Sequence, residues 1–226
     1  MAIQDLVNYT VKNLPDVLTP VLDQVILAAG CDPLEDEYLA QEKCSAKWKE
    51  AGVVLCSFNL TCDVELIKME HLSSAYIKDL SQNQDIVNNG DGTYSSGLYT
   101  KVKLNKEYLK VNAGTTVDTK ICGENISLAN VKDEMQISDA VMESVLECTW
   151  HLDDGKLIQA VLGDVSTSWS DVTHNISGLG AFDWLSDGVA DLYFLFWKDF
   201  LKDELNPLVQ KEINQALKSV EPYYCG

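Results

Sequence analysis

The side chains that most often carry chemistry are few in this chain and widely scattered. Its three histidines are His71, His151 and His174, and no two cysteines have the C-x2-C spacing of a zinc site. A GxSxG nucleophile motif is absent. The segment Gly178-Leu179-Gly180 lacks the further glycine and the lysine of a phosphate-binding loop. We therefore expect no catalytic residue, no metal and no cofactor, and interpret the protein as a non-enzyme.

Two polar segments could act as handles at the mouth of a pocket. They are Trp150-His151 and Asp171-Val172-Thr173-His174. Strand alternation places His151 on the outward side, opposite Trp150, so we interpret it as a surface histidine.

Cysteines and glycosylation motifs point to the compartment. The chain has seven cysteines and four Asn-x-Ser/Thr motifs, at Asn8, Asn59, Asn125 and Asn175. One or two such motifs occur by chance in a chain of this length, and four together with seven cysteines favour a secreted glycoprotein. Met1-Ala2 leads straight into an amphipathic segment, so no signal peptide is predicted and we expect a mature form with an added start residue.

Disulfide pairing is predicted only in part. Cys31 and Cys44 flank a short polar stretch and form the first candidate pair. Cys56 and Cys62 share one strand face about 20 Å apart, so each needs a partner elsewhere. Because seven is odd, one thiol is free or pairs between chains. Cys225, next to the last residue, is the candidate for it.

Bulk composition excludes several classes of partner. The formal charge is −18, from 35 acidic and 17 basic residues. Nucleic acids and anionic membranes need clustered Lys and Arg, so neither is expected as a partner. A hydrophobic content of 46% excludes a disordered chain. We expect one domain, 1–226, that is a monomer or a homodimer.

The run Val189–Leu201 is the most apolar stretch of the chain. Its sequence, VADLYFLFWKDFL, is too short to cross a bilayer, and Asp191, Lys198 and Asp199 interrupt it. A helix that is apolar on nearly every side must be enclosed by protein. We therefore predict a buried helix, sheathed by the rest of the chain, and no stable insertion into a membrane.

Both ends of the chain have helical spacing. Apolar residues from Ile3 recur at steps of three and four, which predicts a helix over 3–29. Pro15 and Pro20 interrupt it, so we expect it to be bent or broken. A second, long helix is predicted over 181–220, with a kink at Pro207.

The middle of the chain, 53–166, has the pattern of antiparallel strands. From Val54 to Leu66 the even positions are apolar and most odd positions are polar, which indicates a long strand with one dry face. Asn88-Asn89-Gly90-Asp91-Gly92 and Asp153-Asp154-Gly155 are turn signals between further strands. The predicted class is α+β, with a meander that curves strongly around the helices.

The order of elements and several local motifs resemble a known superfamily. The motifs are Asp153-Asp154-Gly155, His174-Asn175-Ile176-Ser177-Gly178-Leu179 and Asn206-Pro207-Leu208. The chain resembles the tubular lipid-binding superfamily, most of all the group 7 mite allergens of arthropods, with takeout and juvenile-hormone-binding proteins as second neighbour. This resemblance implies one elongated half-unit that holds a hydrophobic ligand between helix and sheet without enzymatic activity.

A pocket of that kind needs inward-facing apolar residues from both layers. The candidates are Leu14, Leu18, Phe58, Leu60, Val64, Leu66, Leu146, Trp150, Phe194, Phe196, Trp197 and Phe200. For each of them singly, ordinary core packing is the alternative. As a set they suit a terpenoid, fatty acid, sterol or carotenoid-like ligand. We hypothesise a secreted carrier or store of such a molecule. The alternative is a secreted innate-immunity or surface-active interaction protein without a dedicated ligand.

Overall fold

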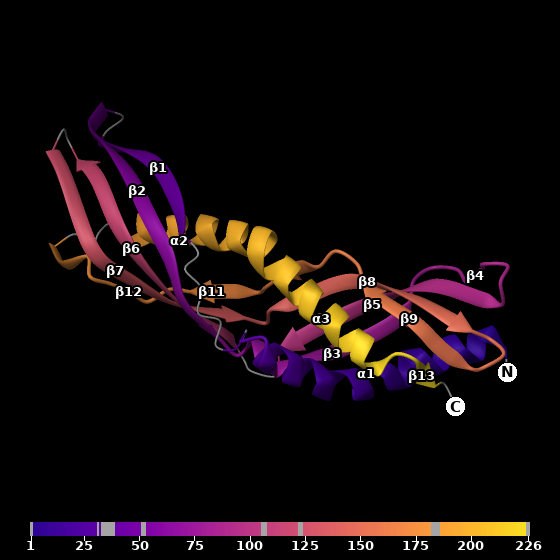
Figure 1. The fold of residues 1–226 in the computed structure, drawn as a ribbon. Helices are drawn as coiled ribbons and strands as arrows, with labels where there is room; N and C mark the ends of the chain where they lie inside the picture. The colour runs from indigo at the N-terminus through magenta and orange to yellow at the C-terminus, as the bar shows by residue number, and fades with distance from the viewer. Residues whose placement is uncertain are drawn as a thin grey trace.

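The computed structural model describes residues 2–30, 32, 39–50, 53–104, 108–121, 124–181 and 186–224. They form an elongated molecule in which two antiparallel sheets lie end to end, with helices running along them (Figure 1). The predicted α+β class, with helices at both ends of the chain and antiparallel sheet between them, is confirmed.

The first sheet has six strands and occupies one end of the molecule (Figure 1). In spatial order its strands are β1 (Leu39–Glu50), β2 (Val53–Glu70), β6 (Tyr108–Ile121), β7 (Glu124–Ser138) and β11 (Asp171–Thr173), and β12 (Ile176–Ser177) also pairs with β7. Three of them, β1, β11 and β12, lie outside the strand region predicted from the sequence.

The second sheet has seven strands and occupies the other end. In spatial order these are β13 (Tyr223–Tyr224), β9 (Lys156–Leu162), β8 (Val141–His151), β5 (Thr93–Leu104) and β3 (Ala75–Gln82), with β10 (Ser166–Ser168) on β8 and β4 (Val87–Asn88) on β5. Because the chain passes from one sheet to the other after β2, β5, β7, β10 and β12, the predicted single meander is wrong.

Helices cover the two sheets separately. The helix α1 (Ile3–Ala28) contacts β3 and α3 (Asn206–Val220), and α3 also contacts β9 of the second sheet. The helix α2 (Ser186–Phe200) contacts β1 and β2 of the first sheet. The long helix predicted over 181–220 is confirmed from Ser186 to Val220, where α2, a π-helical turn (Leu201–Leu205) and α3 follow one another without a break. Its two α-helical parts pack on different sheets, and residues 182–185 lie outside the described part.

Prolines affect the two helical segments differently. Pro15 and Pro20 lie inside an unbroken α1, so of the two expectations, a bent or a broken helix, the break is wrong and the bend stays a prediction. Neither proline belongs to the fully buried stripe of the helix: Pro15 is half-buried and Pro20 is exposed. The kink expected at Pro207 is a π-helical turn, Leu201–Leu205, directly before the first turn of α3 that contains this proline.

The long strand predicted from alternation is β2, and it is longer than expected. A register shift interrupts its pairing with β6 between Leu66 and Lys68. Beyond this bulge Met69 is fully buried, while Lys68 and Glu70 are half-buried. Beyond the bulge the odd positions face the core, because one extra residue exchanges the core-facing and solvent-facing sides of a strand.

A buried hydrogen bond connects α1 to the second sheet. The Trp150 Nε1–H donates to Thr10 Oγ1 over 2.9 Å, and the Thr10 hydroxyl donates to the Leu6 carbonyl oxygen over 2.9 Å. Both Trp150 and Thr10 are 0% exposed. Neither polar group could reach water if the other were removed, so the pair fixes where along β8 the helix lies.

Candidate ligand site

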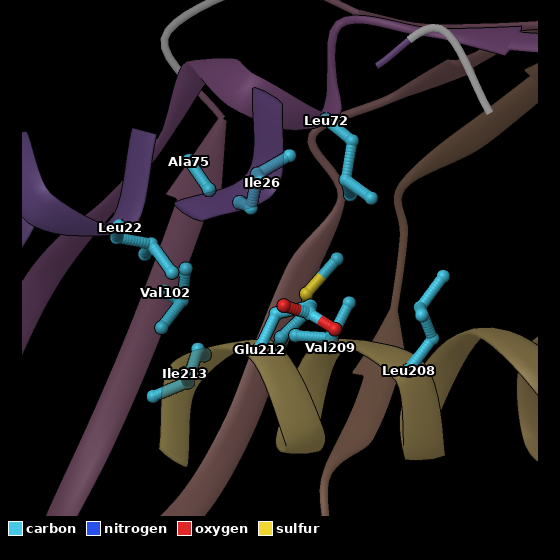
Figure 2. A pocket seen from close by; sticks show the side chains of 10 residues that line it. Leu22, Ile26, Leu72, Ala75, Val102, Leu208, Val209, Glu212 and Ile213 are labelled. Carbon is cyan, nitrogen blue, oxygen red and sulfur yellow. The ribbon is translucent and has the colours of Figure 1, made fainter. Parts of the chain in front are cut away.

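A cavity lies between α1, α3 and the second sheet. Ten side chains line it, and nine of them are apolar (Figure 2). The lining is Leu22 and Ile26 of α1, Leu72, Ala75, Val102 and Met142 from the sheet and the turn before it, and Leu208, Val209, Glu212 and Ile213 of α3. The apolar stripes of two helices and one sheet face thus converge on a single space.

The cavity is small in this conformation. The volume open to the centre of a water-sized sphere is about 10 Å³, which is room for a single water molecule. A terpenoid or acyl chain would therefore fit only after lining side chains or α3 had moved.

Glu212 is the one ionisable side chain of this lining. It is 2% exposed and projects from α3 among the apolar side chains (Figure 2). Its Oε1 lies 3.1 Å from Lys211 Nζ, and the Lys211 side chain is largely exposed. Its Oε2 is buried and has no hydrogen-bond partner among the described residues. A buried carboxylate oxygen without a partner is costly in free energy, so a hydrogen-bond donor placed at Oε2 would stabilise this position.

The helix α2 contributes a second aromatic surface. Val189, Tyr193, Trp197 and Phe200 recur at steps of three and four and are at most 1% exposed. The Trp197 and Phe200 rings are stacked, with centroids 5.4 Å apart. The buried Trp197 Nε1–H has no acceptor among the described residues.

The prediction that α2 is enclosed on nearly every side is wrong. Phe194 is 40% exposed, and Asp191, Lys198 and Asp199 are exposed as well. These positions share the face opposite Tyr193 and Trp197, so the described part of α2 is amphipathic. Only its buried face can take part in an interior pocket.

The exposed Phe194 borders an open groove on the molecular surface. Its ring meets that of Trp169 edge to face, with centroids 6.3 Å apart. Trp169 is half-buried, not the exposed loop residue that its polar neighbours suggested. The groove measures about 370 Å³ and is lined by Trp169, Ser170, Asp171, Val172, His174, Ala190, Asp191 and Phe194. Part of the segment considered as a polar handle, Asp171 to His174, thus lies at this groove.

The predicted ligand-binding residues fall into three groups. Those with buried side chains are Leu14, Leu18, Leu146, Trp150, Trp197 and Phe200. None of these six lines the cavity of Figure 2. Phe194 faces outward, and the side chains of Phe58, Leu60, Val64, Leu66 and Phe196 lie outside the described part. Ligand contact stays a prediction for all of them, although Phe194 does not point into the interior as expected.

Sequence reasoning missed the lining of the cavity, above all Glu212. The signal was present, because Glu212 follows Leu208 by four residues and precedes Ala216 by four. That spacing puts all three on one helix face. A glutamate within the apolar stripe of a helix indicates a buried polar group, which is a candidate for a functional role.

Titratable groups elsewhere form local pairs. The buried Asp133 carboxylate contacts His174 Nδ1 at 2.5 Å and accepts the Asn175 N–H over 3.1 Å. On the surface, the hydrogen bond from the Tyr99 hydroxyl holds the pKa of Glu143 below its usual value, and Lys101 adds to this. Within the described residues, no cluster of three His, Cys, Asp or Glu side chains could hold a metal ion.

The modification sites are placed only in part. Asn8, Asn125 and Asn175 are exposed, and the side chain of Asn59 lies outside the described part. Cys148 is fully buried on the dry side of β8, where alternation predicted it. Cys31, Cys122 and Cys225 lie outside the described residues, so the Cys31–Cys44 pair stays a prediction. Glycosylation also stays a prediction.

Comparisons with known proteins give distant structural matches. No family model and no curated protein matches the chain. The crystal structure of a lipopolysaccharide binding protein matches 94% of this chain and 37% of its own, with 11% identity and a TM-score of 0.39. That of Takeout 1 from Epiphyas postvittana matches 91% of this chain and 88% of its own, with 12% identity and a TM-score of 0.37.

The takeout group named from the sequence thus has a counterpart among solved structures, while similarity to group 7 mite allergens stays a prediction. In the described part of the chain, no helix has the length and apolar composition to cross a membrane.

Proposed function

We propose that the protein is a secreted, non-enzymatic carrier or store of a small hydrophobic ligand. The observation that carries this proposal is the cavity in which apolar faces of α1, α3 and the second sheet meet around one inward-facing polar group. An apolar lining with very few polar groups is the usual composition of a site for a lipid-like molecule. Terpenoids, fatty acids, sterols and carotenoids are the classes in question.

We propose that a movement of α3 opens the cavity. This helix supplies four of the ten lining residues, and it packs on α1. The π-helical turn before it has longer hydrogen-bonded loops than an α-helix, and such turns often occur at functional sites. A small movement of α3 about this turn would separate Leu208 and Val209 from Ile26 and enlarge the apolar space.

The buried face of α2 supports the same function at the first sheet. Its indole N–H at Trp197 is a buried donor whose acceptor is not among the described residues. A ligand that extends from the cavity toward α2 could supply a carbonyl or ether oxygen there. This arrangement would suit an elongated ligand better than a compact one.

Ligand content of the purified protein is the direct test. Native mass spectrometry and organic extraction of protein from its source should reveal one apolar molecule per chain. Absorption and mass spectra of the extract would then distinguish a pigment from a terpenoid or an acyl chain. Extracts without a stoichiometric ligand, together with no binding of fatty acid, terpenoid or pigment in titration, would refute the carrier function.

A matched pair of variants tests the cavity itself. Ala75→Leu fills the lined space, and Ala160→Leu adds the same bulk at another buried position that does not line it. Both should destabilise the fold by about 1–3 kcal/mol through overpacking. Only Ala75→Leu should weaken ligand binding. Equal binding by the two variants would place the ligand elsewhere.

The groove at Phe194 favours the second candidate function, a secreted interaction protein. An aromatic side chain that is 40% exposed beside Trp169 offers a contact for another protein. Phe194→Ser should abolish capture of such a partner and leave ligand binding unchanged. Recovery of a partner through this groove, with no extractable ligand, would favour this function over carriage.

A further inference from the structure

We infer that the cavity at Glu212 selects a neutral hydroxyl head group, so that the ligand is a long-chain or terpenoid alcohol. This inference rests on the proposed carrier function and names the ligand class. It starts from the position of the Glu212 carboxylate, which is 2% exposed and projects into a cavity whose other lining side chains are apolar.

The two carboxylate oxygens of Glu212 have different surroundings. Oε1 makes the ion pair with Lys211 Nζ at 3.1 Å, whereas Oε2 is buried without a partner among the described residues. The ion pair belongs to the charged carboxylate, whose oxygens only accept hydrogen bonds. A ligand that takes the water-sized space beside Glu212 must therefore bring its own donor to Oε2.

Charge decides which donor the site takes. Glu212 and Lys211 together are neutral, so an ammonium head would bring an uncompensated charge into an apolar space. A fatty acid carboxylate would bring a negative charge next to Glu212 and no donor. An alcohol supplies an O–H without charge, and its apolar chain suits the leucine and isoleucine lining.

Titration with a head-group series tests the selectivity. Isothermal calorimetry of the full chain with dodecanol, dodecanoate and dodecylamine compares three heads on one apolar chain. A hydrogen bond to a charged acceptor should give dodecanol about a ten- to hundredfold advantage. The same titrations on three variants identify the acceptor.

The variants differ in what they leave in the cavity. Glu212→Leu should lower dodecanol affinity about tenfold or more, and an apolar replacement of a buried charged group should not impair folding. Glu212→Gln keeps an acceptor oxygen and adds an amide donor, so it should retain dodecanol and bind dodecanoate better. Glu204→Gln removes an exposed charge from the π-helical turn and should change nothing.

The outcomes separate this inference from the carrier function. If wild type binds all three probes alike, or if Glu212→Leu keeps the preference for dodecanol, the inference is wrong and carriage stands. If wild type binds none of the probes or their longer-chain analogues, both are wrong. A preference for dodecanol that is lost with leucine and kept with glutamine supports the assignment.

Discussion

Removing the acceptor of the buried Trp150 indole should loosen α1 from the second sheet. Thr10→Val keeps the shape of the side chain but deprives Trp150 Nε1 of the oxygen that lies 2.9 Å away. Because both positions are 0% exposed, no water replaces it. An unsatisfied buried donor costs about 1–3 kcal/mol. At a central value of about 2 kcal/mol, a chain of this size should lose about 4–8 °C in melting temperature.

A double-mutant cycle isolates this hydrogen bond from the other effects of each substitution. Trp150→Phe removes the donor and leaves a cavity, and Thr10→Ser keeps the acceptor as a control. Denaturant unfolding followed by circular dichroism should give a coupling free energy of about 1 kcal/mol or more between Thr10→Val and Trp150→Phe. If the two changes add within about 0.5 kcal/mol, the bond does not hold α1 on β8.

Three further predictions concern α2, the surface and the cysteines. Trp197→Ala should cost about 3–5 kcal/mol, clearly more than Trp169→Ala at a half-buried position, and equal melting temperatures would contradict the placement of α2. The Tyr99 hydrogen bond lowers the folded-state pKa of Glu143, so its stabilisation is present above the unfolded-state pKa and is lost as pH falls through the folded one. Glu143→Gln should therefore flatten the acid side of a plot of urea midpoint against pH, and an unchanged slope there would contradict this. Cys225→Ser should abolish any disulfide-linked dimer on non-reducing gels, and a dimer that persists would assign the intermolecular thiol to another cysteine.

Local periodicity predicted several of the elements but not how they are grouped. Steps of three and four predicted α1 almost to the residue, and turn signals such as Asp153-Asp154-Gly155 placed the start of β9. Division into two sheets depends on pairings between strands far apart in the chain, such as β2 with β6, which periodicity does not encode. β1 was missed because its polar sequence, LAQEKCSAKWKE, shows little alternation.

The candidate site was predictable in its composition but not in its position. Counting aromatic residues led to α2, where Phe194 is exposed because α2 has only one sheet to pack against. The described cavity lies instead where Ile26, Leu72 and Val209 meet, three residues brought together by the packing of α1 on α3 and on the turn before β3. Which side chains meet there follows from the angle between helices, and no single segment contains that information.

The π-helical turn at Leu201–Leu205 fixes the rotational phase between α2 and α3. Each residue of an α-helix advances the side-chain direction by about 100°, so deleting one residue here would turn α3 by roughly that angle relative to α2. Leu217 and Ile213, which are buried, would rotate away from their packing partners while Trp197 kept its place. The turn before β5, Asn88–Gly92, lies at the surface, and its length does not set the rotation of one packed helix relative to another. Insertions and deletions should therefore be far rarer in the π-helical turn than in Asn88–Gly92, even though Asp203 and Glu204 of the π-helical turn are exposed.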